Sequence, residues 1–198
     1  MTRIIAGHAG SLRIDVPKSG TRPTSDRVRE AIFSTLASRD LIVDARVLDL
    51  YAGSGALGLE AASRGAASVT LVERHPPAAQ VASRNAAIVL GAFKSVTAKS
   101  EVVPQISVER QAVQTFLDSA KQESRWDVVM LDPPYDLDDE TLGTNLAALV
   151  PLLAEDAAVM VERSNRSPEP TWPEGLVRVR EKRYGETTLW WAEPSTPA

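Results

Sequence analysis

The segment Asp132-Pro133-Pro134-Tyr135 carries the strongest chemical signal in the sequence. It follows the apolar run 128–131, so we expect the carboxylate at the end of a buried strand. Two prolines remove backbone donors and stiffen the turn, which lets the Asp132 side chain and the Pro133 carbonyl act as two acceptors in one place. Such a pair can hold both hydrogens of an exocyclic amine and aim its lone pair at an electrophilic carbon, while Tyr135 stacks on the attached ring. The alternative is a rigid turn with a capping carboxylate.

A glycine-rich loop lies upstream of that segment. Gly53, Gly55 and Gly58 match the pattern G-x-G-x-x-G, and Glu73 follows twenty residues after Gly53. This is also the spacing of a dinucleotide-binding fingerprint, in which the later carboxylate accepts ribose hydroxyls. Here, however, Asp49 stands between the strand and the loop, where an acid would repel a pyrophosphate. It suits a ligand with an ammonium and a sulfonium group, which favours S-adenosylmethionine over NAD or FAD.

Strands and helices alternate along the chain, and this alternation should place both motifs at one edge of a sheet. It predicts an α/β, Rossmann-like domain whose mostly parallel seven-stranded sheet has helices on both faces and an antiparallel edge hairpin. Ligands bind at the carboxyl ends of such strands. Trp190 and Trp191 point to opposite faces of the last strand, so we expect at most one to be buried. The expected strands are 47–50, 68–73, 106–108, 126–131, 157–161, 176–182 and 187–191, and the expected helices are 27–37, 57–65, 76–91, 112–121 and 142–153, with a loop over 92–105.

Length and composition limit the class of protein. With 198 residues and 43% hydrophobic residues the chain can bury one domain core. It has no cysteine, and its two histidines, His8 and His75, lie too far apart in sequence to form a metal-binding pair, so we expect no metal. No apolar run approaches the roughly 20 residues that cross a bilayer, and the first residues lack a secretory signal. We therefore expect a soluble protein of the reducing cytoplasm with no membrane partner.

Charge is distributed unevenly along the chain. The net charge is −4, but residues 1–29 hold six Lys or Arg and two Asp, which gives +4 there and −8 on the remainder. A basic end on an acidic body can supply a local phosphate-binding surface, although an ordinary solvated segment has the same composition. Alternating apolar residues around Gly7 and Gly10 predict a small β-hairpin. We expect residues 1–24 to form an RNA-binding hairpin extension and residues 25–198 the catalytic domain.

Together these features resemble the RsmD family of bacterial class I methyltransferases, which methylate the exocyclic N2 amine of a guanine in 16S rRNA of the small ribosomal subunit. The matching segments are residues 3–7, 21–30, 48–55, 132–135 and Tyr184-Gly185. The resemblance implies S-adenosylmethionine as the cofactor, 16S rRNA within an assembling small subunit as the partner, and a monomer. It implies cofactor binding by Asp49, Gly53, Gly55 and Glu73, catalysis by Asp132, Pro133 and Tyr135, and RNA binding by Arg3, His8, Arg22, Arg27 and Arg29.

Two departures and several alternatives accompany this resemblance. Many methyltransferases carry an acid that contacts the adenine amine after the third strand of the sheet, where this chain has Gln111, which we expect to bind adenine instead. The segment Ala92 to Pro104 is also longer than the family usually has, and a surface insertion is our interpretation.

Methylation of adenine N6 or of a protein glutamine would use a similar acceptor pair. A non-catalytic RNA-binding or assembly protein with this fold is the alternative from another class.

Overall fold

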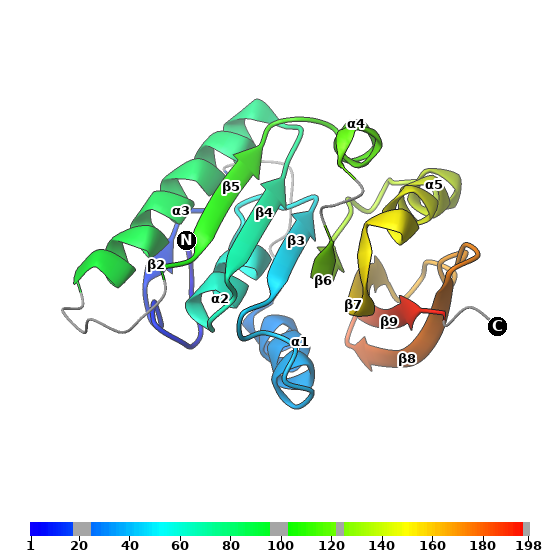
Figure 1. Ribbon diagram of the computed structural model, residues 1–198, viewed down its shortest axis with the longest axis horizontal. Coiled ribbons are helices and arrows are strands. Elements are labelled where there is room, and N and C mark those ends of the chain that lie inside the picture. The colour runs from blue at the N-terminus through cyan, green and yellow to red at the C-terminus, as the bar shows by residue number, and fades with distance from the viewer. Residues whose placement is uncertain (18–24, 96–102, 122–124, 196–198) are drawn as a thin grey trace.

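The computed structural model describes residues 1–17, 25–95, 103–121 and 125–195. It contains a seven-stranded sheet in the order β5-β4-β3-β6-β7-β9-β8, with helices packed against both faces (Figure 1). The first five strands in this order run parallel, and β9 is antiparallel to both β7 and β8. The predicted fold class is therefore confirmed, including the antiparallel hairpin at one edge. The strands are β1 (Thr2–Arg3), β2 (Arg13–Ile14), β3 (Arg46–Leu50), β4 (Ser68–Val72), β5 (Gln105–Glu109), β6 (Trp126–Leu131), β7 (Leu153–Ser164), β8 (Leu176–Tyr184) and β9 (Thr187–Pro194), and the helices are α1 (Asp26–Ala37), α2 (Ala56–Ser63), α3 (Pro76–Ser95), α4 (Val113–Ser119), α5 (Asp139–Leu149) and the short 3₁₀ helix η1 (Val150–Leu152).

Two helices differ from their predicted bounds. α5 begins at Asp139, three residues before the predicted start, because the Asp138 carboxylate accepts from the Thr141 backbone N–H at 2.6 Å. It gives way at residue 150 to η1, which contains Pro151, so the predicted helix end at residue 153 is wrong. α3 runs past Gly91 to Ser95, and the predicted loop from residue 92 is wrong over this stretch. The remainder of that segment, 96–102, lies outside the described residues.

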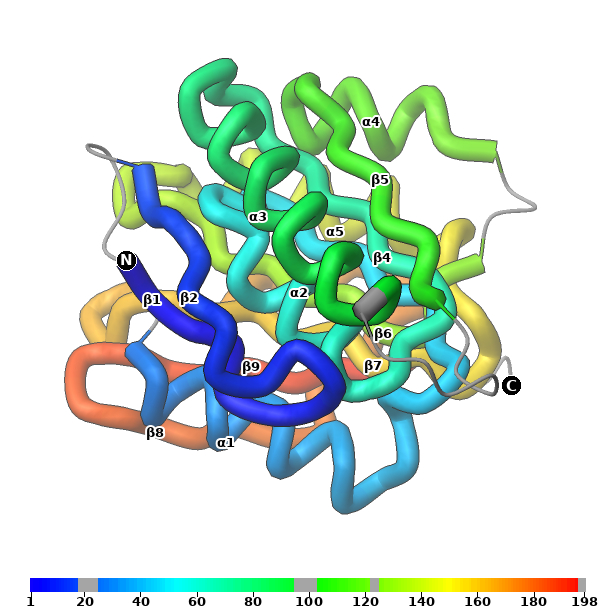
Figure 2. The backbone as a smooth tube through the Cα atoms, turned by 90° about the vertical axis from the view of Figure 1, so that its left-hand side faces the viewer, coloured from blue at the N-terminus to red at the C-terminus, as the bar shows by residue number. Residues whose placement is uncertain are grey.

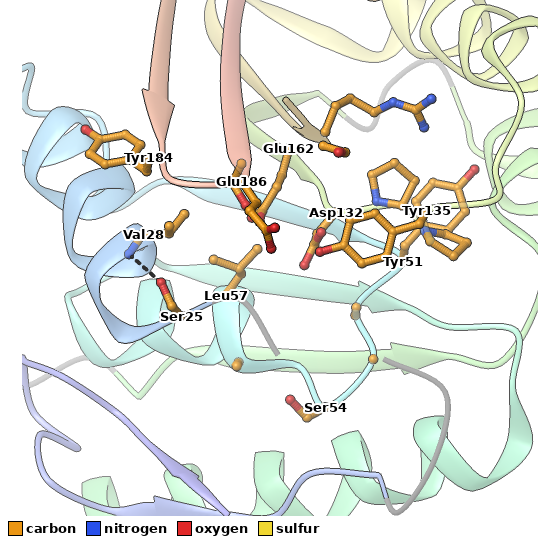
Figure 3. Close-up of a pocket in the computed structure, with 18 of the residues that line it drawn as sticks. Ser25, Val28, Tyr51, Ser54, Leu57, Asp132, Tyr135, Glu162, Tyr184 and Glu186 are labelled. Carbon is orange, nitrogen blue, oxygen red and sulfur yellow. Dashed lines mark hydrogen bonds between the residues drawn. The ribbon is translucent and has the colours of Figure 1, made fainter. Parts of the chain in front are cut away.

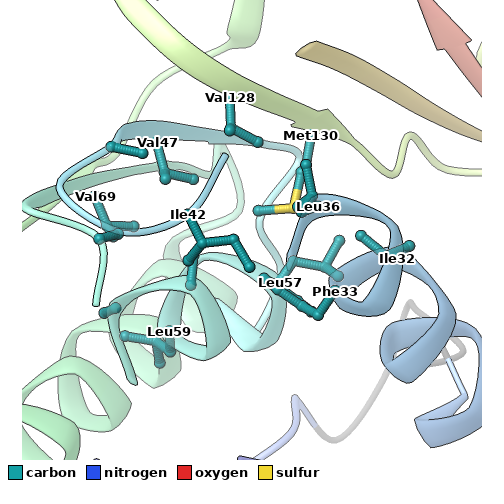
Figure 4. Packing of buried hydrophobic residues seen from close by; sticks show 14 of the residues in the cluster. Ile32, Phe33, Leu36, Ile42, Val47, Leu57, Leu59, Val69, Val128 and Met130 are labelled. Carbon is teal, nitrogen blue, oxygen red and sulfur yellow. The ribbon is translucent and has the colours of Figure 1, made fainter. Parts of the chain in front are cut away.

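Two hydrophobic clusters fill the two faces of the sheet. The first lies beneath α1, α2 and α3 and contains Phe33 and Met130 (Figure 4). The second lies beneath α4 and α5. Trp191 belongs to the first cluster and Trp190 to the second, and they are 3% and 6% exposed. The expectation that at most one is buried is wrong, because β9 is covered on both faces rather than one.

The N-terminal strands pair with each other and pack onto the helical layer of the first cluster (Figures 1 and 2). Ile4 and Ile14 are buried in that cluster. The buried carboxylate of Glu60 on α2 accepts from the backbone N–H groups of Ile5 and Ala6 at 2.6 and 3.0 Å. The hairpin thus shares a hydrophobic core with the seven-stranded sheet and its helices. The predicted domain boundary after residue 24 adjoins residues 18–24, which lie outside the described residues. Within the described ranges, no helix is long and apolar enough to cross a membrane.

Candidate active site

Two adjoining cavities open at the carboxyl ends of the parallel strands. The first, of about 680 Å³, lies between the ends of β3, β6 and β7 and the turn that joins β8 to β9. The second, of about 670 Å³, lies over the end of β4 and the first turns of α3. Tyr51, Gly53, Asp132 and Pro134 line both cavities. The predicted reactive carboxylate therefore lies where the two cavities meet, as a group transfer between two bound molecules requires.

Asp49, the fourth residue of β3, lines the first cavity and is 1% exposed. Its Oδ2 accepts from the backbone N–H of Gly58 at 2.8 Å, whereas Oδ1 has no hydrogen-bond partner among the described residues. Burial raises its pKa to about 7, the Gly58 hydrogen bond opposes this, and the charges of Asp132 and Glu73 raise it further. A buried carboxylate with one unused oxygen is suited to a cationic partner such as an ammonium group.

The glycine-rich loop turns the chain from β3 into α2. Gly55 adopts a φ of +78° at the helix N-cap, a conformation that glycine adopts without steric cost. Gly58 lies one turn later, where an added Cβ would come within 2.4 Å of a methyl group of Leu71 on β4. The glycines therefore allow α2 to start tightly and to lie close against the sheet. Tyr51, ahead of them, has a φ of +63°, which is unusual for a residue with a side chain.

Glu73 directly follows β4 and lines the second cavity. Its carboxylate accepts from the backbone N–H of Gly53 at 2.9 Å and from that of His75 at 2.7 Å. These bonds fix the carboxylate beside the glycine-rich loop, at the edge where a ribose would meet it. Predicted cofactor residues Asp49, Gly53 and Glu73 are thus brought together. Gln111 lines neither cavity, so its predicted contact with adenine has no support in this geometry, and Val113 lines the second cavity instead.

The Asp132-Pro133-Pro134-Tyr135 segment leaves β6 and lines the first cavity (Figure 3). Asp132 and Pro134 also line the second cavity. Pro133 is buried and Tyr135 is 69% exposed, so the ring projects from the turn. Arg163 holds the residues that follow, because its guanidinium donates to the Leu137 carbonyl at 3.1 Å and to the Asp139 carboxylate at 2.8 Å. Sequence reasoning missed Arg163.

A second network that the sequence did not reveal supports Tyr51. Its hydroxyl hydrogen-bonds to the side-chain oxygen of Asn145 on α5, and the Asn145 amide donates to Gln114 on α4 at 2.7 Å. Asn145 is 1% exposed. The aromatic ring that lines both cavities is thereby fixed from behind by two helices. No local pattern links residues that are this distant in sequence.

The predicted RNA residues occupy different environments. Arg27 is exposed and lines the first cavity, and Arg3 is exposed on β1. His8 stacks on Phe93 of α3 with ring centroids 4.2 Å apart, away from both cavities. Arg22 lies outside the described residues.

Arg29 corrects a prediction. Its side chain is 0% exposed, and one guanidinium nitrogen donates to the Thr2 hydroxyl at 2.9 Å, the Arg3 carbonyl at 2.9 Å and the Asp26 carboxylate at 2.6 Å. The predicted RNA contact is wrong because this group is buried. Arg29 instead ties the N-terminal hairpin to α1.

Comparisons with known proteins identify the family of this chain. The family described as Conserved hypothetical protein 95 matches residues 2–193. Ribosomal RNA small subunit methyltransferase D of Escherichia coli is 38% identical over 93% of this chain and 85% of its own length. The Haemophilus influenzae protein of the same name is 34% identical over 92% of this chain and 89% of its own. The solved structure of a hypothetical Thermus thermophilus protein superimposes with a TM-score of 0.79 at 32% identity, covering 98% of this chain and 99% of that one.

The family match extends over almost the whole chain, and it includes the N-terminal hairpin as well as both motifs of the cleft. The resemblance that the motifs indicated is therefore confirmed: the chain belongs to the Conserved hypothetical protein 95 family, which is the RsmD family.

Proposed function

We propose that the protein is an S-adenosylmethionine-dependent methyltransferase that modifies the exocyclic N2 amine of a guanine in 16S rRNA of the small ribosomal subunit. The observation that carries this proposal is the position of Asp132, at the wall shared by two cavities of similar size. The relatives described above are named as small-subunit ribosomal RNA methyltransferases, which supports RNA as the substrate.

The residues present fit this cofactor. The unused Oδ1 of Asp49 would accept from its ammonium group, and Glu73 would accept from its ribose hydroxyls beside Gly53. Gly55 keeps the loop compact around the same end of the sheet. When bound, the cofactor would supply a methyl carbon on a positive sulfonium as the electrophile, with the neutral thioether as its leaving group, and the amine would release one proton to solvent.

The side chains of the first cavity would prepare the amine for this displacement. Asp132 and the Pro133 carbonyl would accept its two hydrogens and direct the lone pair toward the methyl carbon of the cofactor, which Asp49 would hold from the first cavity and Glu73 from the second. Tyr135 would stack on the base, which must leave its helix or already be unpaired. Arg27 at the cavity rim and the exposed Arg3 would contact phosphates.

The test is transfer of radiolabelled methyl from S-adenosylmethionine to unmodified small ribosomal subunits and to naked 16S rRNA, with the product nucleoside identified by mass spectrometry. N2-methylguanosine is the expected product. N6-methyladenosine would refute the choice of base while leaving the chemistry intact. Absence of label from a protein that still binds the cofactor would refute ribosomal RNA as the substrate.

A further inference from the structure

Glu162 lies beside Asp132 at the carboxyl edge of the sheet. β6 and β7 are parallel and pair Leu131 with Val161. Asp132 directly follows the end of β6, and Glu162 is the next residue of β7. Because side chains alternate along a strand, both belong to the face that carries Met130 and Met160. The two carboxylates therefore occupy neighbouring positions in one cavity, as Figure 3 shows.

The setting of Glu162 makes it a fixed acceptor. It is 8% exposed and belongs to a strand that is paired on both sides, to β6 and to β9. The Thr187 hydroxyl lies 3.4 Å from its Oε1. Glu186, the other glutamate of this cavity, is exposed in the turn between β8 and β9. Only the buried glutamate is held by the sheet itself.

Two neighbouring acceptors match one base in particular. In guanine the ring N1–H lies next to the exocyclic N2 amine, so its edge presents three hydrogens in a row. The ring nitrogens beside the amines of adenine and cytosine are unprotonated and would face a carboxylate lone pair. We propose that Glu162 accepts from guanine N1–H while Asp132 and the Pro133 carbonyl hold the N2 amine. Glu162 is then the residue that selects guanine, an inference that rests on the proposed function.

A base analogue separates this role from simple support of the fold. 2-Aminopurine carries the same exocyclic amine but has no hydrogen on N1 and no oxygen on C6, so the change of the rate ratio on substitution of Glu162 isolates the N1 contact. Small subunits would be reconstituted with RNA that holds guanine or 2-aminopurine at the position that product analysis identifies. Wild-type protein should methylate guanine about 10- to 100-fold faster than 2-aminopurine, because one hydrogen bond to a charged group contributes a rate factor of this size.

Glu162→Gln should lower the guanine rate by roughly tenfold, because the amide oxygen can still accept from N1–H but carries no charge. It should not lower the 2-aminopurine rate, because the amide N–H can donate to an unprotonated N1. A purely structural role would lower both rates together. Glu155→Gln is the matched control, since Glu155 is exposed at the opposite end of β7, and it should change neither rate.

The outcomes separate the two hypotheses. Failure of wild-type protein to methylate guanine would refute the proposed function. Equal wild-type rates on guanine and 2-aminopurine would overturn the role of Glu162 without recourse to any variant. An unchanged rate ratio in Glu162→Gln, or a loss of selectivity in Glu186→Gln alone, would overturn it as well.

Discussion

Asp49 should make the stability of the ligand-free protein depend on pH near neutrality. Its folded-state pKa is about 7, mainly because the carboxyl is buried, against 3.8 for the exposed group. Because the folded pKa is the higher one, the native state keeps a proton that the unfolded chain loses between these values. The resulting stability is fully present below about pH 3.8 and is lost as the pH rises through 7. A shift of about three units corresponds to about 4 kcal/mol in total.

The substitution Asp49→Asn removes this titration and keeps the size of the side chain. Its amide oxygen can still accept from the Gly58 N–H. Between pH 5 and 7 the unfolding free energy of the wild type should fall relative to the variant by about 2 kcal/mol in total, with the slope decreasing as the pH approaches 7. Urea unfolding without ligand at several pH values measures this difference. Parallel curves for the two proteins would refute the buried, protonated state of Asp49.

The same titration should govern binding of S-adenosylmethionine, because only the ionised carboxylate attracts its ammonium group. The dissociation constant of the wild type should rise about tenfold per pH unit below 7, whereas Asp49→Asn should bind weakly with little dependence on pH. Since the charge of Asp132 raises the pKa of Asp49, Asp132→Asn should move the onset of this weakening to lower pH. Calorimetric titrations that give a constant affinity from pH 5.5 to 8 would contradict the assignment of Asp49.

Three further predictions concern catalysis, the N-terminal region and packing. Asp132→Asn should lower kcat by about 10²- to 10³-fold in the methyl-transfer assay, with the affinity for S-adenosylmethionine at neutral pH within about tenfold of the wild type. Arg29→Met should cost about 1–3 kcal/mol of stability in urea unfolding, because three hydrogen bonds are lost. Arg27→Ala should leave stability unchanged and reduce the slope of log RNA affinity against log salt by about one. Equal stability losses would contradict the different roles of these arginines. Gly58→Ala should destabilise the protein by about 1–3 kcal/mol, because its Cβ would lie 2.4 Å from Leu71, and an unchanged urea midpoint would show that the helix can shift away from the sheet.

The part of the site that could be predicted from sequence follows a single rule. Asp49, Glu73 and Asp132 are polar residues at or just after the ends of short apolar runs, and parallel strands bring such ends to one edge. Glu162 obeys the same rule, because it directly follows the predicted strand 157–161. By contrast, the contact between Tyr51 and Asn145 joins residues 94 positions apart, and it depends on how α5 packs rather than on any local pattern.

The error at Arg29 could have been avoided from the sequence, because hydrophobic periodicity also constrains charged residues. Residues spaced i, i+3, i+4 and i+7 share one face of a helix. Counted from Arg29, these positions are Ile32, Phe33 and Leu36, which are all buried beneath α1. Arg27 lies two residues away, a spacing that puts side chains on different faces, and it is exposed at the cavity. Two arginines in one basic segment thus have opposite roles, and the phase of the helix distinguishes them where net charge cannot.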